Sequence, residues 1–280
     1  MSTDAGSTHR LRVFGAVIVV GVGMALLVGS AGSGAPGAAQ LPKRYYLALG
    51  DSIAYGFQPT KANATRPSAF RGYVEVFAAR LRKLSPQIEV INYGCPGEST
   101  TTFARGRCPT LPGVKLHDAY RGPQLKAAVA FLRAHPGEVS PITLTLWGND
   151  LAPLSAKGKR APAAIASFAP RFAAILRQLR GAAPNADIIV TGAWNPEANG
   201  LAQTTPLYRQ VDAAIRRAAT GSRARVVSMF AAFNGSGNVR AQKARLCRLT
   251  FACKDDPHPN DAGYRAMADA FLAASGYPRK

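Results

Sequence analysis

Residues 45–52 read YYLALGDS, and five apolar residues that run directly into Gly-Asp-Ser are typical of a buried strand that ends in a tight turn. Similar short apolar runs follow at residues 88–92, 142–146, 187–191 and 225–228. Between them apolar residues recur at helical spacing, most clearly over residues 165–179. Strands that alternate with helices predict a three-layer α/β/α domain around a five-stranded parallel sheet.

The chain of 280 residues divides into a leader and one predicted domain. Arg10 and Arg12 precede the uncharged apolar stretch 13–29, and small residues suited to a signal peptidase follow at 30–39. Residues 1–40 therefore predict a secretory signal peptide plus linker. An uncleaved N-terminal anchor is the alternative, because the apolar stretch is long for a signal core and short for a membrane span. Residues 41–280 show no second linker and are expected to form one exported, extracytoplasmic domain.

The composition is strongly basic, with 35 Lys+Arg against 15 Asp+Glu and a net charge of +20. A hydrophobic content of 47% excludes a disordered chain. The basic residues are scattered and no nucleic-acid-binding module is present, so nucleic acid is not an expected partner. Attraction to an anionic envelope surface and a basic surface without a partner both remain open.

Four cysteines predict disulfides if the protein is exported. Two pairs are close in sequence, Cys95 with Cys108 and Cys247 with Cys253, although four cysteines allow three connectivities. A zinc site would call for C-x-x-C spacing or a nearby histidine pair, and the sequence has neither. No metal is therefore expected.

The segments that follow the predicted strands carry the residues of an acyl-transfer site. In a parallel sheet, ligands bind beyond the carboxyl ends of the strands. Ser52 stands there as a candidate nucleophile that needs an adjacent base, and His258 is the candidate base. Asp255 could orient the imidazole from its other ring nitrogen. The N–H of Ser52, the N–H of Gly97 and the side-chain amide of Asn149 are candidate donors to an oxyanion.

In their order these segments resemble the four blocks of the SGNH (GDSL) hydrolase family. The matching elements are Gly-Asp-Ser at 50–52, a glycine at 97, Asn-Asp at 149–150 and Asp-x-x-His at 255–258. The resemblance implies a flavodoxin-like sheet and hydrolysis of ester or thioester bonds without a cofactor. By position it implies that Ser52 is nucleophile and oxyanion donor, Gly97 and Asn149 are further donors, His258 is the base and Asp255 orients it. Exported actinobacterial lipases of this family also carry disulfides.

The third block departs from the family pattern. Trp147 stands where the family usually has glycine, and this substitution bears directly on where Asn149 is placed. Glu98, Asp150 and Asp256 are interpreted as residues that form turn and loop hydrogen bonds.

The expected function is an exported serine esterase or lipase that acts on a lipid, acyl or acetylated-glycan ester. A carbohydrate acetyl esterase and a catalytically silent, basic envelope-binding protein on the same scaffold are the alternatives.

Overall fold

A central sheet of five parallel strands forms the middle of the computed structural model, which describes residues 41–109 and 114–278. The predicted leader, residues 1–40, lies outside the described residues. The strands are β1 (Tyr45–Gly50), β2 (Glu89–Asn92), β3 (Val139–Thr145), β4 (Ile188–Thr191) and β5 (Arg225–Val227).

The strand order is β2-β1-β3-β4-β5, and each neighbouring pair is parallel. This order is the flavodoxin-like one, so the predicted fold class is confirmed. The order reverses between β1 and β3, and a crevice for ligands is expected beyond the carboxyl ends of these two strands. The chain leaves β1 directly into Asp51-Ser52 and leaves β3 toward Trp147.

Burial explains which apolar runs became central strands. All six residues of β1 and all seven of β3 are buried, as expected of strands covered on both faces. Leu47 of β1 pairs with Ile91 on one side and with Ile142 on the other. At the edge of the sheet, β2 is only partly covered.

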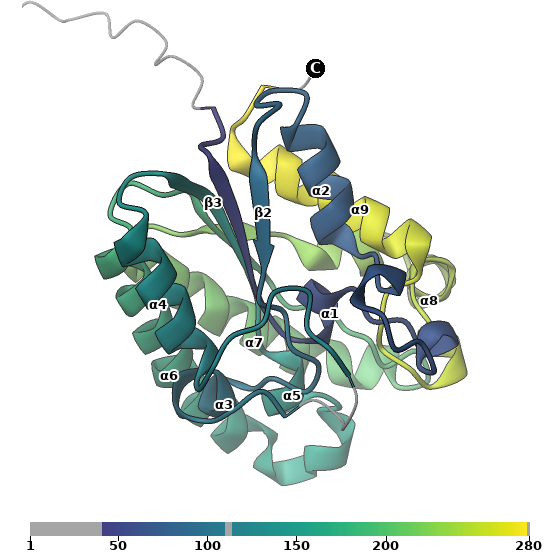
Figure 1. Ribbon diagram of the computed structural model, residues 1–280. Coiled ribbons are helices and arrows are strands. Elements are labelled where there is room, and N and C mark those ends of the chain that lie inside the picture. The colour runs from purple at the N-terminus through teal and green to yellow at the C-terminus, as the bar shows by residue number, and fades with distance from the viewer. Residues whose placement is uncertain (1–40, 110–113, 279–280) are drawn as a thin grey trace, which may run out of the picture. The chain divides into compact units, whose positions relative to one another are not determined.

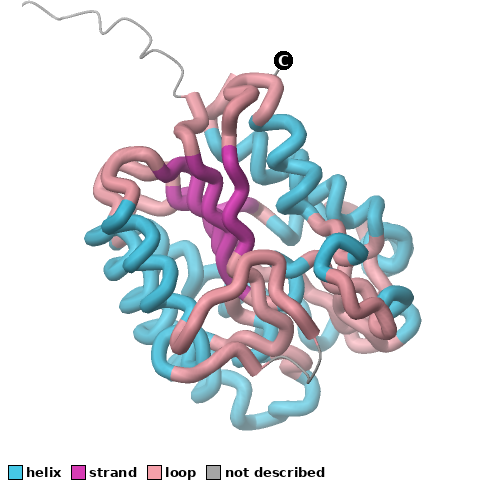
Figure 2. Tube along the Cα trace, viewed as in Figure 1, coloured by secondary structure: helices cyan, strands magenta, loops and turns pink. Residues whose placement is uncertain are grey.

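Helices cover both faces of the sheet (Figures 1 and 2). On one face α4, α6 and α7 pack side by side, and on the other α2 packs against α9. The longer helices are α2 (Tyr73–Leu81), α4 (Gln124–Ala134), α6 (Ala161–Ala182), α7 (Leu201–Gly221), α8 (Val239–Leu249) and α9 (Asp261–Ser275). The shorter ones include α1 (Ser52–Tyr55), α3 (Thr100–Arg105), α5 (Gly148–Leu151), and the 3₁₀ turns η3 (Ser155–Arg160) and η5 (Ala252–Lys254).

Asn260 caps the last helix, because its side chain accepts hydrogen bonds from the N–H groups of Ala262 and Gly263. Helix α8 was not predicted, since of its residues only Leu246 and Leu249 are buried and most of the others are basic or small. Within the described residues, no helix is both long and apolar enough to cross a membrane.

Candidate active site

The turn after β1 holds Ser52 at the start of α1. Asp51 caps this helix by accepting a hydrogen bond from Ile53 N (3.0 Å), and its carboxylate also accepts one from Thr145 Oγ1 (3.0 Å) at the end of β3. Gly50 has a φ of 126°, and a Cβ there would overlap the carbonyl oxygen of Thr145. Only glycine lets the two strands meet this closely, so the Gly-Asp-Ser sequence fixes Ser52 at the switch point of the sheet.

Ser52 and His258 meet although they lie 206 residues apart. Ser52 Oγ is 2.8 Å from Nε2 of His258, and Nδ1 of the same ring is 2.8 Å from Oδ1 of Asp256. A carboxylate can only accept, so Nδ1 carries the proton and Nε2 is left to accept from the serine hydroxyl. The ring of Phe57 packs edge-on against the imidazole, with ring centroids 4.7 Å apart.

The prediction that Asp255 orients His258 is wrong in this geometry. Asp255 adopts a left-handed conformation with φ 58° at the end of η5, and its side chain is exposed at the rim. This turn directs the next residue, Asp256, toward the imidazole. Oδ1 of Asp256 also accepts from the backbone N–H of His258 (2.9 Å). This contact from an Asp side chain to the N–H two residues later is an Asx turn, which the sequence Asp-Pro-His favours.

The hydrogen bonds to His258 keep Asp256 ionised. Burial by itself would raise the pKa of this carboxyl, but the hydrogen bonds and the charge of His258 outweigh burial, so the pKa lies below its ordinary value. An ionised acceptor next to Nδ1 is the arrangement that stabilises an imidazolium when the base takes up a proton.

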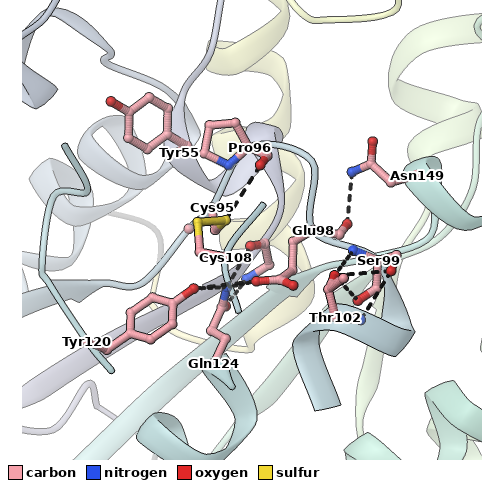
Figure 3. The surroundings of a disulfide bond; sticks show 12 residues. Tyr55, Cys95, Pro96, Glu98, Ser99, Thr102, Cys108, Tyr120, Gln124 and Asn149 are labelled. Carbon is pink, nitrogen blue, oxygen red and sulfur yellow. Dashed lines mark hydrogen bonds between the residues drawn. A yellow bond between two sulfur atoms is a disulfide. The ribbon is translucent and has the colours of Figure 1, made fainter. Parts of the chain in front are cut away.

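The candidate oxyanion donors belong to Ser52, Gly97 and Asn149. The N–H groups of Ser52 and Gly97 donate no hydrogen bond within the described part of the chain, and Gly97 has a φ of 85°. Nδ2 of Asn149, on α5, donates to the carbonyl oxygen of Glu98 (2.8 Å; Figure 3). The amide has a second hydrogen free to donate elsewhere. Ser52, Asn149 and His258 line one pocket. Gly97 is not among its lining residues, and its loop is joined to the pocket by the hydrogen bond from Asn149 to the carbonyl oxygen of Glu98.

Trp147 does not displace Asn149. Its side chain is buried and packs edge-on against Trp194, with ring centroids 4.9 Å apart, and against Tyr208 at 5.9 Å. The tryptophan therefore forms part of a wall, while the following Gly148-Asn149 still reaches Glu98.

A cavity of about 540 Å³ opens at Ser52 and His258. Most of its wall is apolar. The apolar lining residues are Ile53, Leu146, Trp147, Ala152, Pro153, Trp194, Pro196, Ala198, Ala252 and Pro257.

Both disulfides lie beside the site. Cys95 pairs with Cys108 and closes the loop that contains Gly97 (Figure 3). Cys247 pairs with Cys253 and ties α8 to η5, directly before Asp256 and His258. No group of three or more potential metal ligands occurs among the residues that the structure describes.

Sequence reasoning also missed Gln124, the first residue of α4. It is fully buried and binds both backbone groups of Gly50, the residue before Asp51 and Ser52. No motif marks it, because the contact joins residues 74 positions apart.

Comparison with known proteins agrees with this geometry. The model of the GDSL-like lipase/acylhydrolase family matches residues 48–266, so the chain belongs to this family and is an SGNH-type ester hydrolase. No curated protein sequence matches the chain.

Among solved structures, the chain is similar in fold to several esterases and lipases at low sequence identity. One is the acetylxylan esterase Axe2 from Geobacillus stearothermophilus, with 17% identity, a TM-score of 0.56, and coverage of 86% of this chain and 97% of that one. The lipase Lip_vut3 from a goat rumen metagenome has 18% identity, a TM-score of 0.59, and coverage of 85% and 99%. A putative GDSL-like lipase from Parabacteroides merdae has 19% identity, a TM-score of 0.58, and coverage of 85% and 98%.

Proposed function

We propose that the protein is an exported serine esterase that forms an acyl-enzyme on Ser52 and prefers esters with an acyl chain longer than acetyl. The hydrogen-bonded chain from Ser52 Oγ through His258 to Asp256 supports the mechanism most directly. Export is supported by the basic and apolar pattern of residues 10–29.

In the proposed first half-reaction, His258 Nε2 takes the proton of Ser52 as Oγ attacks the ester carbonyl. The negative charge that develops on the carbonyl oxygen is stabilised by the N–H groups of Ser52 and Gly97 and by the amide of Asn149. As the tetrahedral intermediate collapses, the imidazolium returns its proton to the leaving alcohol. Water then attacks the acyl-enzyme by the same route, with His258 as base, and releases the carboxylic acid and Ser52.

The cavity supports the preference for a longer acyl chain. An acetyl group would fill only a small part of 540 Å³. Each methylene that moves from water into an apolar pocket gains about 0.8 kcal/mol, or up to about fourfold in kcat/KM if that gain is kept in the transition state. The two tryptophans, Trp147 and Trp194, give the wall the rigid apolar surface that such a chain would contact.

We expect kcat/KM for p-nitrophenyl esters to rise by at least about tenfold from acetate to octanoate. Trp147→Phe should move the preference toward longer chains because it enlarges the pocket, whereas Phe168→Leu, a change in the core away from the pocket, should not. Initial rates across the ester series test this. A maximum at acetate would favour a carbohydrate acetyl esterase, and no turnover of any ester would favour the silent binding protein.

Cations on η3 and α8, two elements that contact the loop lining this pocket, support an anionic surface as partner. We call five of these cations the basic rim: Lys157, Lys159, Arg160, Arg240 and Lys243. The first three belong to η3 and the other two to α8. Within the described residues none of them pairs with a carboxylate.

Two contacts place η3 and α8 beside the loop that lines the pocket. The N–H of Ser155 on η3 donates to Glu197 Oε1 (3.1 Å), and Nζ of Lys243 on α8 donates to Asn199 Oδ1 (3.2 Å). Glu197 and Asn199 are both lining residues. A lipid bilayer with anionic headgroups would thus meet positive charge around the pocket that receives its acyl chains.

Lys157→Gln/Lys159→Gln/Arg160→Gln should weaken binding to phosphatidylglycerol-containing vesicles by up to about 100-fold, at about 1 kcal/mol for each cation near the surface. The matched control is Arg82→Gln/Lys83→Gln/Arg133→Gln, which removes the same charge from exposed positions just before β2 and β3, toward the amino ends of the strands and away from the pocket. Cosedimentation in a Ser52→Ala background measures binding without hydrolysis. Equal losses in both triple variants would show only non-specific attraction by net charge and would contradict a role for the rim.

A further inference from the structure

Glu98 and Gln124 link the segment that carries the nucleophile to the segment that carries the oxyanion amide. Both side chains are fully buried. They come from separate elements, Glu98 from the loop closed by Cys95–Cys108 and Gln124 from the first turn of α4. Figure 3 shows the two side chains directed toward one another, with Tyr120 beside them.

Gln124 holds Gly50 at both of its backbone groups. Its Oε1 accepts from Gly50 N (2.7 Å), and its Nε2 donates to Gly50 O (3.0 Å). Gly50 is followed directly by Asp51 and Ser52, so the position of this amide fixes where the chain leaves β1. A shift of this turn would move both the attacking Oγ and the N–H of Ser52.

Glu98 fixes the orientation of the Gln124 amide. Its Oε2 accepts from Gln124 Nε2 (3.2 Å) and from the hydroxyl of Tyr120 (3.4 Å). Because this oxygen accepts, it selects the NH₂ end of the amide and leaves Oε1 of Gln124 for Gly50 N. The main chain of Glu98 at the same time accepts from Asn149 Nδ2 (2.8 Å).

We propose that Glu98 and Gln124 act as a pair of positioning residues that keeps Ser52 and Asn149 in the geometry needed for attack on the ester carbonyl. The inference rests on the proposed function, since it assigns a role within that reaction. Neither residue touches the reacting atoms, so the pair acts through Gly50 and Asn149.

The surroundings of Glu98 indicate that its carboxyl is neutral over part of the physiological pH range. Burial raises its pKa to about 7. The titratable groups that face it are Tyr120 and Asp51, and burial also raises the pKa of Asp51 to about 6. No cation pairs with Glu98 among the described residues. Oε1 of Glu98 is buried and has no hydrogen-bond partner in the part of the chain that the structure describes.

The kinetic test compares Glu98→Leu with Glu98→Gln. Leucine removes the acceptor that orients Gln124, and we expect kcat to fall by about 10- to 100-fold with little change in KM, as for a small misplacement of reacting groups. Glutamine keeps an acceptor oxygen and should restore kcat to within a few fold of the wild type. Tyr120→Phe removes a hydroxyl that accepts from Gln124 Nε2 (3.2 Å) and donates to Glu98 Oε2 but keeps both Gln124–Gly50 hydrogen bonds, so its loss of kcat should be smaller than that of Glu98→Leu.

Gln124→Asn tests the pair from the other side and serves if Glu98→Leu does not fold. The amide is retained but is one methylene too short to reach both groups of Gly50, so kcat should fall here too. Adding Glu98→Leu to Gln124→Asn should cost little more, since the two residues act on one another. A Glu98→Leu protein with the kcat of the wild type, or a Glu98→Gln protein as damaged as Glu98→Leu, would overturn the proposal.

Two readouts do not depend on turnover. Backbone amide exchange at Gly50 should be faster in Glu98→Leu and Gln124→Asn than in the wild type and in Glu98→Gln. Because the pKa of Glu98 is raised on folding, its contribution to stability is present below the unfolded pKa and is lost as pH rises through about 7. The Tm of Glu98→Gln should therefore exceed that of the wild type at about pH 8, and the difference should vanish near pH 4.

These outcomes separate the inference from the proposed function. A wild type without ester turnover refutes the proposed function, and the exchange of Gly50 still decides whether the pair positions the turn. An active wild type whose variants keep both kcat and the slow exchange of Gly50 refutes only the inference.

Discussion

Replacement of Ser52 by alanine is expected to lower kcat for p-nitrophenyl esters by at least about 10⁴-fold, because the variant lacks the oxygen that attacks the carbonyl. A small residual rate above that of water should remain, since the oxyanion donors and the pocket are still present. The fold should be unaffected: Oγ of Ser52 contacts His258 at the surface of the pocket, and the cap of α1 belongs to Asp51.

Ser155→Ala is the matched control for this experiment. Ser155 lines the same pocket, but its contact with Glu197 is made by the backbone N–H and survives the substitution. Its kcat should stay within a few fold of that of the wild type. Equal rates for the wild type and Ser52→Ala would show that Ser52 is not the nucleophile, whatever the rate of the Ser155 variant.

Asp256→Asn is expected to lower kcat by about 10²- to 10⁴-fold, whereas Asp255→Asn should change it by no more than a few fold. An asparagine next to Nδ1 can present its NH₂ group, which favours the wrong tautomer of His258 and no longer stabilises the imidazolium. The exposed Asp255 has no such contact with the ring.

Kinetics of the two variants at about pH 8 make this comparison direct, because the lowered pKa of Asp256 keeps that carboxyl ionised there. The substitutions are chemically identical, remove the same charge and lie on adjacent residues, so each variant is the control for the other. A larger loss in Asp255→Asn than in Asp256→Asn would return the orienting role to Asp255.

The charge of Asp256 supports the native state only above the pKa that the carboxyl has in the folded protein, so the difference in Tm between Asp256→Asn and the wild type should shrink as the solution is acidified.

The sheet could be predicted because its signals are local. Residues 45–49 and 142–146 are apolar over the length of a strand and are followed by Gly-Asp-Ser and by Trp-Gly-Asn. An uninterrupted apolar run of this length is enough to predict a strand that is buried on both faces. Helix α8 could not be predicted in this way, because it buries only Leu246 and Leu249 against the domain and has too few apolar residues for a clear period.

Site residues were harder to predict where the backbone conformation decides which of two candidate side chains reaches the site. The sequence does not distinguish the adjacent aspartates 255 and 256 as partners of His258. The left-handed turn at Asp255 determines which one faces the imidazole. Gln124 is determined by a neighbour in space, Gly50, that no local pattern connects to it. Ser52, Asn149 and His258 were found because their family pattern stands at strand ends.

The long separation between Ser52 and His258 also makes activity a measure of how complete the fold is. The nucleophile belongs to the first strand, and its base arrives 206 residues later. Every strand of the sheet is synthesised between or before them, and α9, which packs against α2, follows directly after the histidine. A chain interrupted anywhere before residue 258 has a serine without a base, so an esterase assay on nascent or truncated chains reports the arrival of the last segment of the protein.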